Sequence, residues 1–499
     1  MEIKATIGEA TFTCRGELEA YFQPFREATI GTNLTFSTPF GQQRMIYADW
    51  TASGRLYAPI ERKITEELGP FIANTHTESN ITSTKTTLAY QYAKELIKRH
   101  VNAGRNDVII MEGAGMTSAV NKLQRLLGLR VPEQWKSRLK LPDEKRPVIF
   151  VTHMEHHSNL LSWAETIGEV VTIRPTANGD VDVNHLQELL RTYAHRPLKI
   201  GAFTACSNVT GIQTPYHQLA KIMHEHAGIC FVDFAASAPY VAINMHPDDP
   251  QEKLDGIYFS PHKFLGGPGS AGVLIFDARL YQNRIPDHPG GGTVIWTDPW
   301  GNYQYIDDIE TREGGGTPPV LQTIKAALAI RLKEKMGIER MLKREKELTA
   351  LFLSQLKQIP RVHILEGHRE DRLGIVSFII EGMHYNLVVK LLNDRFGIQT
   401  RGGCSCAGPY GHYLLGIDKE QSKQIMTQVK QGNLLSKPGW VRISLHPIMT
   451  NEDIYHIIRA IRHLVRHAEK WKQEYIYDYK KNEFHHRNDD RDVRHLFTL

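Results

Sequence analysis

The chain has 499 residues, of which 41% are apolar and 23% charged, a composition typical of a soluble globular protein long enough for two domains. Its 60 basic and 55 acidic side chains leave a net charge of +5, too small at this length to favour nucleic-acid binding. No apolar run reaches the roughly 18 residues of a membrane span, and no apolar signal segment opens the chain. Five cysteines are too few for a disulfide framework, so we expect a cytoplasmic protein with no membrane partner.

Short apolar, β-branched runs predict seven buried strands, and helical patterns at 118–129 and 216–226 separate some of them. The runs are 107–112, 147–152, 169–174, 198–204, 228–233, 255–260 and 271–276. Strands that alternate with helices predict an α/β domain with a mainly parallel sheet. Ligands of such sheets bind beyond the carboxyl ends of the strands.

Downstream of these runs, residues 319–358 carry a long amphipathic pattern that predicts two helices broken near Gly337. Further strands are predicted within 372–380 and 439–445. We therefore expect a large α/β domain and a smaller α+β domain joined by a helix, with a polar tail at the end. The expected limits are 41–320 for the large domain, 321–344 for the helix, 1–40 with 345–475 for the small domain, and 476–499 for the tail.

The segment "MEGAGMTSAVNKL" (111–123) places a glycine-rich turn between a predicted strand and a predicted helix. Backbone N–H groups at a helix start, uncrowded by side chains, can hold an anion, and Gly115, Met116 and Thr117 are the candidates. The pattern also approaches the dinucleotide motif G-x-G-x-x-G, although Ser118 replaces the last glycine. An ordinary strand–helix connection is the other alternative.

Polar side chains follow three more of the predicted strands. In "THMEHHSNLLSW" (152–163) the histidine spacing matches neither H-E-x-x-H nor H-x-x-E-H, so we expect no metal; His156 can instead lay its ring on a flat ligand. Asn208 follows the fourth strand and Asp233 ends the fifth. A carboxylate at the end of an apolar strand is costly unless paired, so Asp233 is expected to meet a cation, either in a structural ion pair or in a functional site.

The segment "SPHKFLGGPGSAGVLIF" (260–276) adds Ser260, His262 and Lys263 at the end of the sixth strand. Most lysines on such loops are solvated, but the residues at the other strand ends favour a functional one. An anion cradle, a flat imidazole, a buried acid and a lysine together fit pyridoxal phosphate. This cofactor needs a Schiff-base lysine, a carboxylate opposite its pyridinium nitrogen, and helix-start amides for its phosphate.

The last cluster combines "IQTRGGCSCAGPYG" (398–411) with "WVRISLHP" (440–447). Arg401 and Arg442 are forked cations that can grip a carboxylate, as an amino-acid substrate would need. Cys406 lies on a Gly/Ser/Pro loop expected to be mobile and accessible, where basic neighbours would favour the thiolate. Cys404 and Cys406 can equally be an incidental pair, since C-x-C without further partners is poor support for zinc.

With these residues in place, the chain resembles the class V aminotransferase-fold enzymes that use pyridoxal phosphate, and among them the cysteine desulfurase and selenocysteine lyase branch. The likeness runs from "IYADWTASGR" (46–55) to "VRISLHP", about four-fifths of the chain, and includes "EHHSN", "SNVTG", D-x-A and S-x-HK in this order. It implies the fold type I of pyridoxal-phosphate-dependent transferases, with a mainly parallel seven-stranded sheet domain and a smaller α+β domain.

The resemblance also implies roles for single residues. Lys263 would be the Schiff-base lysine, His156 would stack on the pyridine ring, and Asp233 would pair with the ring nitrogen. Asn208 would contact the oxygen side of the ring, and Arg442 would bind the substrate carboxylate, a task to which we also assign Arg401 and Asn208. The phosphate would be held by Gly115, Met116, Thr117, Ser260 and His262, and by Thr317 of "GGGTP" (314–318) reaching from the neighbouring subunit of a homodimer.

"CAGP" (406–409) resembles the run that carries the desulfurase nucleophile, so Cys406 would attack the sulfur of a cysteine–cofactor adduct and become a persulfide while alanine is released. The chain departs from the family at Ala236, where members commonly have glutamine. Gly403-Cys404-Ser405 also differs from the histidines of one desulfurase group, and about 35 residues separate Cys406 from Arg442, more than in compact desulfurases. An R-x-G-C-x-C loop also resembles the sulfurase domain of molybdenum-cofactor maturation enzymes.

Three hypotheses follow. The leading one is a homodimeric enzyme that moves sulfur from L-cysteine to Cys406 and passes it on, in some cases to an acceptor protein. The second keeps the cofactor but changes the chemistry to transamination, epimerisation or β-elimination on another amino acid, because Ala236 and the altered loop depart from the family pattern. The third is a non-catalytic sulfur carrier or scaffold, against which the intact Lys263 argues.

Overall fold

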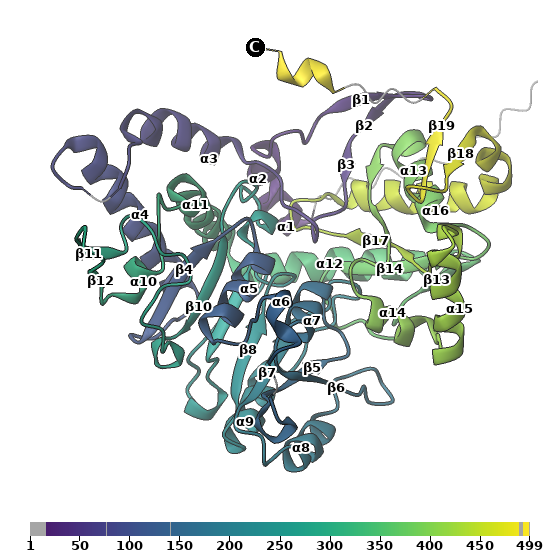
Figure 1. Ribbon diagram of the computed structural model, residues 1–499. Coiled ribbons are helices and arrows are strands. Elements are labelled where there is room, and N and C mark those ends of the chain that lie inside the picture. The colour runs from purple at the N-terminus through teal and green to yellow at the C-terminus, as the bar shows by residue number, and fades with distance from the viewer. Residues whose placement is uncertain (1–15, 76, 140, 489–492, 499) are drawn as a thin grey trace, which may run out of the picture.

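The computed structural model describes residues 16–75, 77–139, 141–488 and 493–498, and its centre is a seven-stranded sheet (Figure 1). The strand order is β4-β10-β9-β8-β7-β5-β6, and only β10 runs against its neighbours β4 and β9. All seven predicted runs form these strands, which confirms the α/β fold with a mainly parallel sheet. The bounds are β4 (Asp107–Glu112), β5 (Val148–Thr152), β6 (Glu169–Ile173), β7 (Lys199–Thr204), β8 (Ile229–Asp233), β9 (Gly256–Phe259) and β10 (Gly272–Asp277).

Helices cover both faces of this sheet, which is why its central strands are apolar at every position rather than at alternate ones. In β5, Val148 and Phe150 face one core while Ile149 and Val151 face the other. The helices of the first face are α4 (Ile81–His100), α8 (Val183–Thr192), α9 (Tyr216–Glu225) and α11 (Val320–Met336), and those of the second are α5 (Met116–Leu126) and α7 (His157–Ala164). None of the described helices is long and apolar enough to cross a bilayer.

The predicted break near Gly337 is confirmed, because α11 ends at Met336 and α12 (Ile338–Leu356) begins directly after it. Gly337 has a φ of 79°, which a residue without a side chain adopts at little cost.

Beyond the β4 edge of the large sheet, an arm and a small hairpin extend beside α4 (Figure 1). They contain α3 (Ala58–Arg62), β11 (Val294–Thr297), β12 (Tyr303–Tyr305) and α10 (Ile309–Arg312); α6 (Glu133–Lys136) precedes β5.

A second, antiparallel sheet of order β13-β14-β17-β16 forms the smaller half of the molecule. Its strands are β13 (Val362–Ile364), β14 (Ile375–Ile380), β16 (Arg401–Gly403) and β17 (Trp440–Ser444), and its helices are α12, α13 (Tyr385–Phe396), α14 (Gly408–Leu415), α15 (Lys419–Lys430) and α16 (Asn451–Trp471). The N-terminal part lies against this half: β3 (Ile46–Tyr47) pairs with β15 (Ile398–Gln399), and Glu19 forms an ion pair with Arg344 at 3.1 Å. The N-terminal elements are α1 (Glu17–Tyr21), α2 (Gln23–Glu27), β1 (Thr35–Thr38) and β2 (Gly41–Arg44).

The segment for which we expected a polar tail contains a hairpin, β18 (Tyr475–Asp478) and β19 (Glu483–His486). Aromatic residues recur at alternate positions of "YIYD" (475–478), so they share one side of the hairpin, which can pack against the smaller half of the molecule. Tyr475 is buried and its hydroxyl donates a hydrogen bond to Asp394 at 3.0 Å. We retain the predicted division into two domains as a proposal, with this hairpin added to the smaller one.

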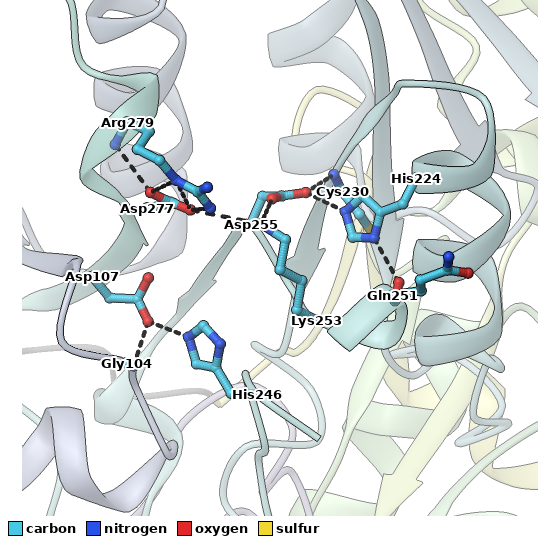
Figure 2. Close-up of polar contacts among 10 residues, drawn as sticks. All are labelled: Gly104, Asp107, His224, Cys230, His246, Gln251, Lys253, Asp255, Asp277 and Arg279. Atoms are coloured by element: carbon cyan, nitrogen blue, oxygen red, sulfur yellow. Dashed lines mark hydrogen bonds and ion pairs between the residues drawn. The ribbon is translucent and has the colours of Figure 1, made fainter. Parts of the chain in front are cut away.

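A cluster of buried acids lies at the opposite edge of the large sheet from the carboxyl ends of its parallel strands (Figure 2). Asp255 is 2.7 Å from His224 and 2.8 Å from Lys253, and it accepts a hydrogen bond from the backbone of Cys230 at 2.8 Å. Nearby, Asp107 pairs with His246 at 2.6 Å. Each of these two acids therefore has a basic partner, so the ion pairs stabilise this edge of the sheet.

We predict that Asp255→Ala lowers the free energy of unfolding by about 3 kcal/mol, because His224, Lys253 and a backbone N–H lose their common partner. Urea unfolding measures the change. Asp248→Ala removes an exposed carboxylate from the same region and is expected to cost less than about 0.5 kcal/mol. Equal stability of the two variants would contradict a structural role for this cluster.

Candidate active site

A cavity of about 670 Å³ lies where β7, β8 and β9 end and α5 begins, at the junction with the smaller sheet. All but one of the residues singled out from the sequence line it; the exception is Thr317. The predicted residues in its wall are Gly115, Met116, Thr117, His156, Asn208, Asp233, Ser260, His262, Lys263, Arg401, Cys406 and Arg442. The carboxyl edge of the parallel sheet therefore brings together side chains that are far apart in the sequence.

The start of α5 forms a small cradle at one end of the cavity. The backbone N–H of Met116 donates to Ser260 Oγ at 2.8 Å, and the hydroxyl of Thr117 lies 2.7 Å from that of Ser158. A Cβ atom at Gly115 would stand 2.9 Å from Ser260 Oγ, so a side chain there would close the cradle. Helix-start N–H groups beside hydroxyls favour an anion such as a phosphate.

Lys263 and Asp233 lie on adjacent strand ends in the same cavity. Burial lowers the pKa of Lys263 to about 8, although the nearby carboxylate of Asp233 raises it in part. Burial raises the pKa of Asp233 to about 6, while a hydrogen bond from the backbone of Ala235 at 2.8 Å and the charge of Lys263 act in the opposite direction. Within the described part of the chain, Lys263 Nζ has no hydrogen-bond partner, so the amine is available to a ligand.

His156 is the N-cap residue of α7, and its Nδ1 accepts a hydrogen bond from the backbone N–H of Ser158 at 3.1 Å. Burial, and then the charge of Lys263, lower the pKa of His156 to about 3. The imidazole is therefore neutral at physiological pH. The imidazole of His156 is thus neutral, flat and fixed by its hydrogen bond to the start of α7. Such a ring is suited to stack on another flat ring.

Arg401 and Arg442 are direct neighbours across β16 and β17, where like charges would repel each other. Asp49 lies between them and binds the guanidinium of each at 2.9 Å. Arg442 also donates to the carbonyl of Asn208 at 3.0 Å, whereas its Nε and the side-chain oxygen of Asn208 are buried without a hydrogen-bond partner. The Nε of Arg442 is a donor available to a bound carboxylate, and the side-chain oxygen of Asn208 is an acceptor available to a ligand group that donates.

Cys406 lies in a tight turn in which the backbone N–H of Ala407 donates to the carbonyl of Cys404 at 3.0 Å. Both central residues, Ser405 and Cys406, have positive φ values of 49° and 55°, which costs energy for residues with side chains. Neighbouring groups hold the turn: Asn208 donates to the carbonyl of Ser405 at 2.7 Å, and the indole of Trp440 lies 3.2 Å from the hydroxyl of Ser405. Cys406 is exposed and faces the cavity, while Cys404 is half-buried.

Thr317 lies away from Lys263, beside a second cavity of about 650 Å³. Its side chain is exposed, and it does not line the cavity that contains the cradle at α5. A role for Thr317 in phosphate binding would require a second copy of the chain.

The sequence by itself did not reveal every residue of the cavity wall. It indicated no role for Asp49, although an acid within the first segment of the family resemblance (46–55) was a usable signal. It also missed Tyr385, Asn386 and Asn482, which come from α13 and from the turn of the C-terminal hairpin. No local pattern places a residue near position 482 beside the loop of Cys406.

The chain belongs to the aminotransferase class-V family, whose sequence model matches residues 46–457. Among curated relatives, a "Probable cysteine desulfurase" of Staphylococcus epidermidis is 28% identical over 424 residues, 84% of this chain and 92% of that protein. Another, of Halalkalibacterium halodurans, is 29% identical over 375 residues, 74% of this chain and 86% of that protein. The predicted family resemblance is confirmed.

Solved structures support the fold. The cysteine desulfurase of Thermococcus onnurineus has a TM-score of 0.70 at 23% identity and covers 89% of this chain and 98% of its own. The cysteine desulfurase CsdA of Escherichia coli has a TM-score of 0.67 at 22% identity and covers 90% of this chain and 98% of its own. The predicted fold type I is confirmed by this likeness.

We predict that acetic anhydride modifies Lys263 of the cofactor-free protein with a half-maximal rate near pH 8, because only the neutral amine reacts. Exposed Lys481 is the internal control for the amount of reagent in each reaction. Asp233→Asn is expected to lower the midpoint for Lys263, since the carboxylate raises the pKa of the amine. Peptide mass spectrometry follows both sites, and a Lys263 midpoint near the ordinary lysine value of about 10.4 would contradict the burial of Lys263.

Proposed function

We propose that this member of the aminotransferase class-V family is a pyridoxal-phosphate-dependent cysteine desulfurase, which converts L-cysteine to alanine and transfers the sulfur to Cys406. The observation that carries the proposal is one cavity that contains Lys263, Asp233 and the exposed thiol of Cys406. The names of the curated relatives agree with this reaction.

The residues of the cavity fit pyridoxal phosphate. The cradle of Gly115, Met116 and Ser260 suits a phosphate, and a Cβ at Gly115 would fill it. The buried side-chain oxygen of Asn208 lacks a partner, as expected of a group that contacts a ligand. When bound, the cofactor withdraws electrons from the α-carbon of an amino acid.

The proposed roles of the chain's own groups follow from their pKa values. Lys263 Nζ would hold the cofactor aldehyde and could move the proton of the substrate α-carbon; a pKa near 8 leaves part of the amine neutral at physiological pH. Asp233, with a pKa near 6, is mainly ionised at that pH and holds the proton of the pyridine nitrogen. The neutral ring of His156 orients the cofactor by stacking.

The substrate and the sulfur would be handled at the other end of the cavity. Arg442, assisted by Arg401 and Asn208, binds the substrate carboxylate, which then competes with Asp49 for the guanidinium groups. The net reaction balances: L-cysteine and the thiol of Cys406 give alanine and a persulfide on Cys406. A small thiol or an acceptor protein then removes the outer sulfur, which returns Cys406 to its thiol.

The described cysteines are compatible with this chemistry in a reducing compartment. Cys206, Cys230, Cys404 and Cys406 are all free thiols, and burial raises the pKa of Cys206 and of Cys230 well above the usual range. We therefore propose the cytoplasm as the site of action.

Another class V reaction is the second candidate, and Ala236 favours it. Ala236 lines the cavity where family members commonly have glutamine, so the cofactor oxygen loses one donor. Faster turnover of an amino acid other than cysteine, without any sulfur on the protein, would support this candidate and reject the desulfurase.

We predict that Cys406→Ala lowers the rate of alanine formation from cysteine at least about 100-fold, because the sulfur acceptor is absent. The visible absorbance of the bound cofactor is expected to remain, since the substitution leaves Lys263 and Asp233 in place. Cys404→Ala is the matched variant of the same turn and should still accept sulfur on Cys406, as shown by mass spectrometry. Undiminished alanine formation by Cys406→Ala would exclude the persulfide mechanism.

We also propose a homodimer. Large apolar side chains are exposed on the β11–β12 hairpin: Ile295, Trp296, Trp300 and Tyr303. Further exposed apolar residues, Ile81, Leu88 and Tyr92, belong to α4, beside the hairpin (Figure 1). A second copy of the chain on this side would cover these residues. It would also bring Thr317 of one chain close to the neighbouring chain.

Sedimentation is predicted to give a mass of two 56.8 kDa chains. Trp296→Glu combined with Trp300→Glu should shift the protein toward the monomer, because two charges would have to be buried in the interface. Met426→Glu, on the exposed face of α15, is the control and should leave the dimer intact. A monomeric wild-type protein would contradict the proposal.

A further inference from the structure

The C-terminal hairpin β18–β19 lies outside the family match, which ends at residue 457, yet it contributes to the active-site cavity. The hairpin packs beside α13 (Figure 1), and its turn places Asn482 in the cavity wall. The family relation therefore says nothing about this part of the wall.

Several contacts fasten the hairpin to the smaller half of the molecule. At its start, Tyr475 donates to Asp394, and Glu474 forms an ion pair with Arg395 at 2.6 Å. At its end, the ring of His486 packs edge-on against Phe40, with 5.3 Å between centroids. The turn between the strands is thus held in one place.

Asn482 makes hydrogen bonds with three groups from the tip of this turn. Its Nδ2 donates to the hydroxyl of Tyr385 at 2.9 Å, and its Oδ1 accepts from the hydroxyl of Tyr477 at 2.9 Å. Its backbone carbonyl accepts from the side chain of Asn386. The φ of Asn482 is 57°, a conformation that asparagine tolerates better than most residues with side chains. These bonds fix the ring of Tyr385.

The ring of Tyr385 lies against Gly402 of β16 and against Gly439, which directly precedes β17. A Cβ atom at Gly439 would be 2.5 Å from the ring, and one at Gly402 would be 3.1 Å from it. In the register of β16 and β17, Gly403 is opposite Trp440, and Trp440 bonds to Ser405 in the turn of Cys406. A movement of the ring would therefore move the strand ends from which this turn begins.

We propose that Asn482 is a positioning residue for Cys406, acting through Tyr385 and through Gly402 and Gly439, which lie in β16 and directly before β17. The inference rests on the proposed sulfur transfer to Cys406 and adds that a segment beyond the family match orients the accepting thiol. Because Cys406 acts after the substrate has bound, Asn482 affects the rate of sulfur transfer rather than the binding of cysteine.

The test uses the holoenzyme and the variant Asn482→Gly, which keeps the left-handed backbone and the carbonyl bonded by Asn386 but removes the side-chain amide. The expected result is a kcat for alanine formation about fivefold lower at unchanged KM for cysteine, as for one hydrogen bond of ordinary strength. Tyr385→Phe removes the same bond from its other partner and should have a similar effect. The double variant should be no slower than either single one.

Lys481→Ala, an exposed residue of the same turn, is the matched control and should keep the wild-type kcat. Mass spectrometry of the wild-type protein after one turnover separates the two claims. Absence of sulfur on wild-type Cys406 would reject the proposed function itself. Sulfur on wild-type Cys406 combined with a normal kcat of Asn482→Gly, or with additive effects of the two single variants, would reject the positioning role alone.

Discussion

The electrostatic balance between Lys263 and Asp233 is the interaction on which the site depends. Asp233 ends β8 and Lys263 follows the neighbouring parallel strand β9, so the geometry of the sheet brings their side chains to one edge. Burial lowers the pKa of the amine to about 8 and raises that of the carboxyl to about 6, while each charge partly offsets the effect of burial on the other. The result is an amine that can react and a carboxylate that can hold a proton, both in one cavity at physiological pH.

The smaller half of the molecule completes the site with a second set of charges. Arg401 and Arg442 would repel each other across their strands without Asp49, which comes from the other end of the chain. This arrangement keeps two guanidinium groups ready for a carboxylate. The strained turn with Cys406 is attached to the same strands through Trp440 and to the large sheet through Asn208, so the thiol is held where the two halves meet.

The parts of this architecture that were predictable are those with local signals. The seven strands followed from short apolar runs, and the break at Gly337 followed from an amphipathic pattern interrupted by glycine. The polar residues at strand ends could be grouped because parallel strands end at one edge. Asp49 and Asn482 were missed because their roles depend on residues far along the chain: Arg442 is 393 positions from Asp49, and Tyr385 is 97 positions from Asn482. The role expected of Thr317 depends on a second chain and remains a proposal.

The most direct test of the account is borohydride reduction of the purified protein followed by peptide mass spectrometry. The proximity of a reactive amine, a cradle for phosphate and a buried acid predicts a single pyridoxyl group attached to Lys263. A protein that carries no such group after incubation with pyridoxal phosphate, or that carries it mainly on other lysines, would contradict the central claim.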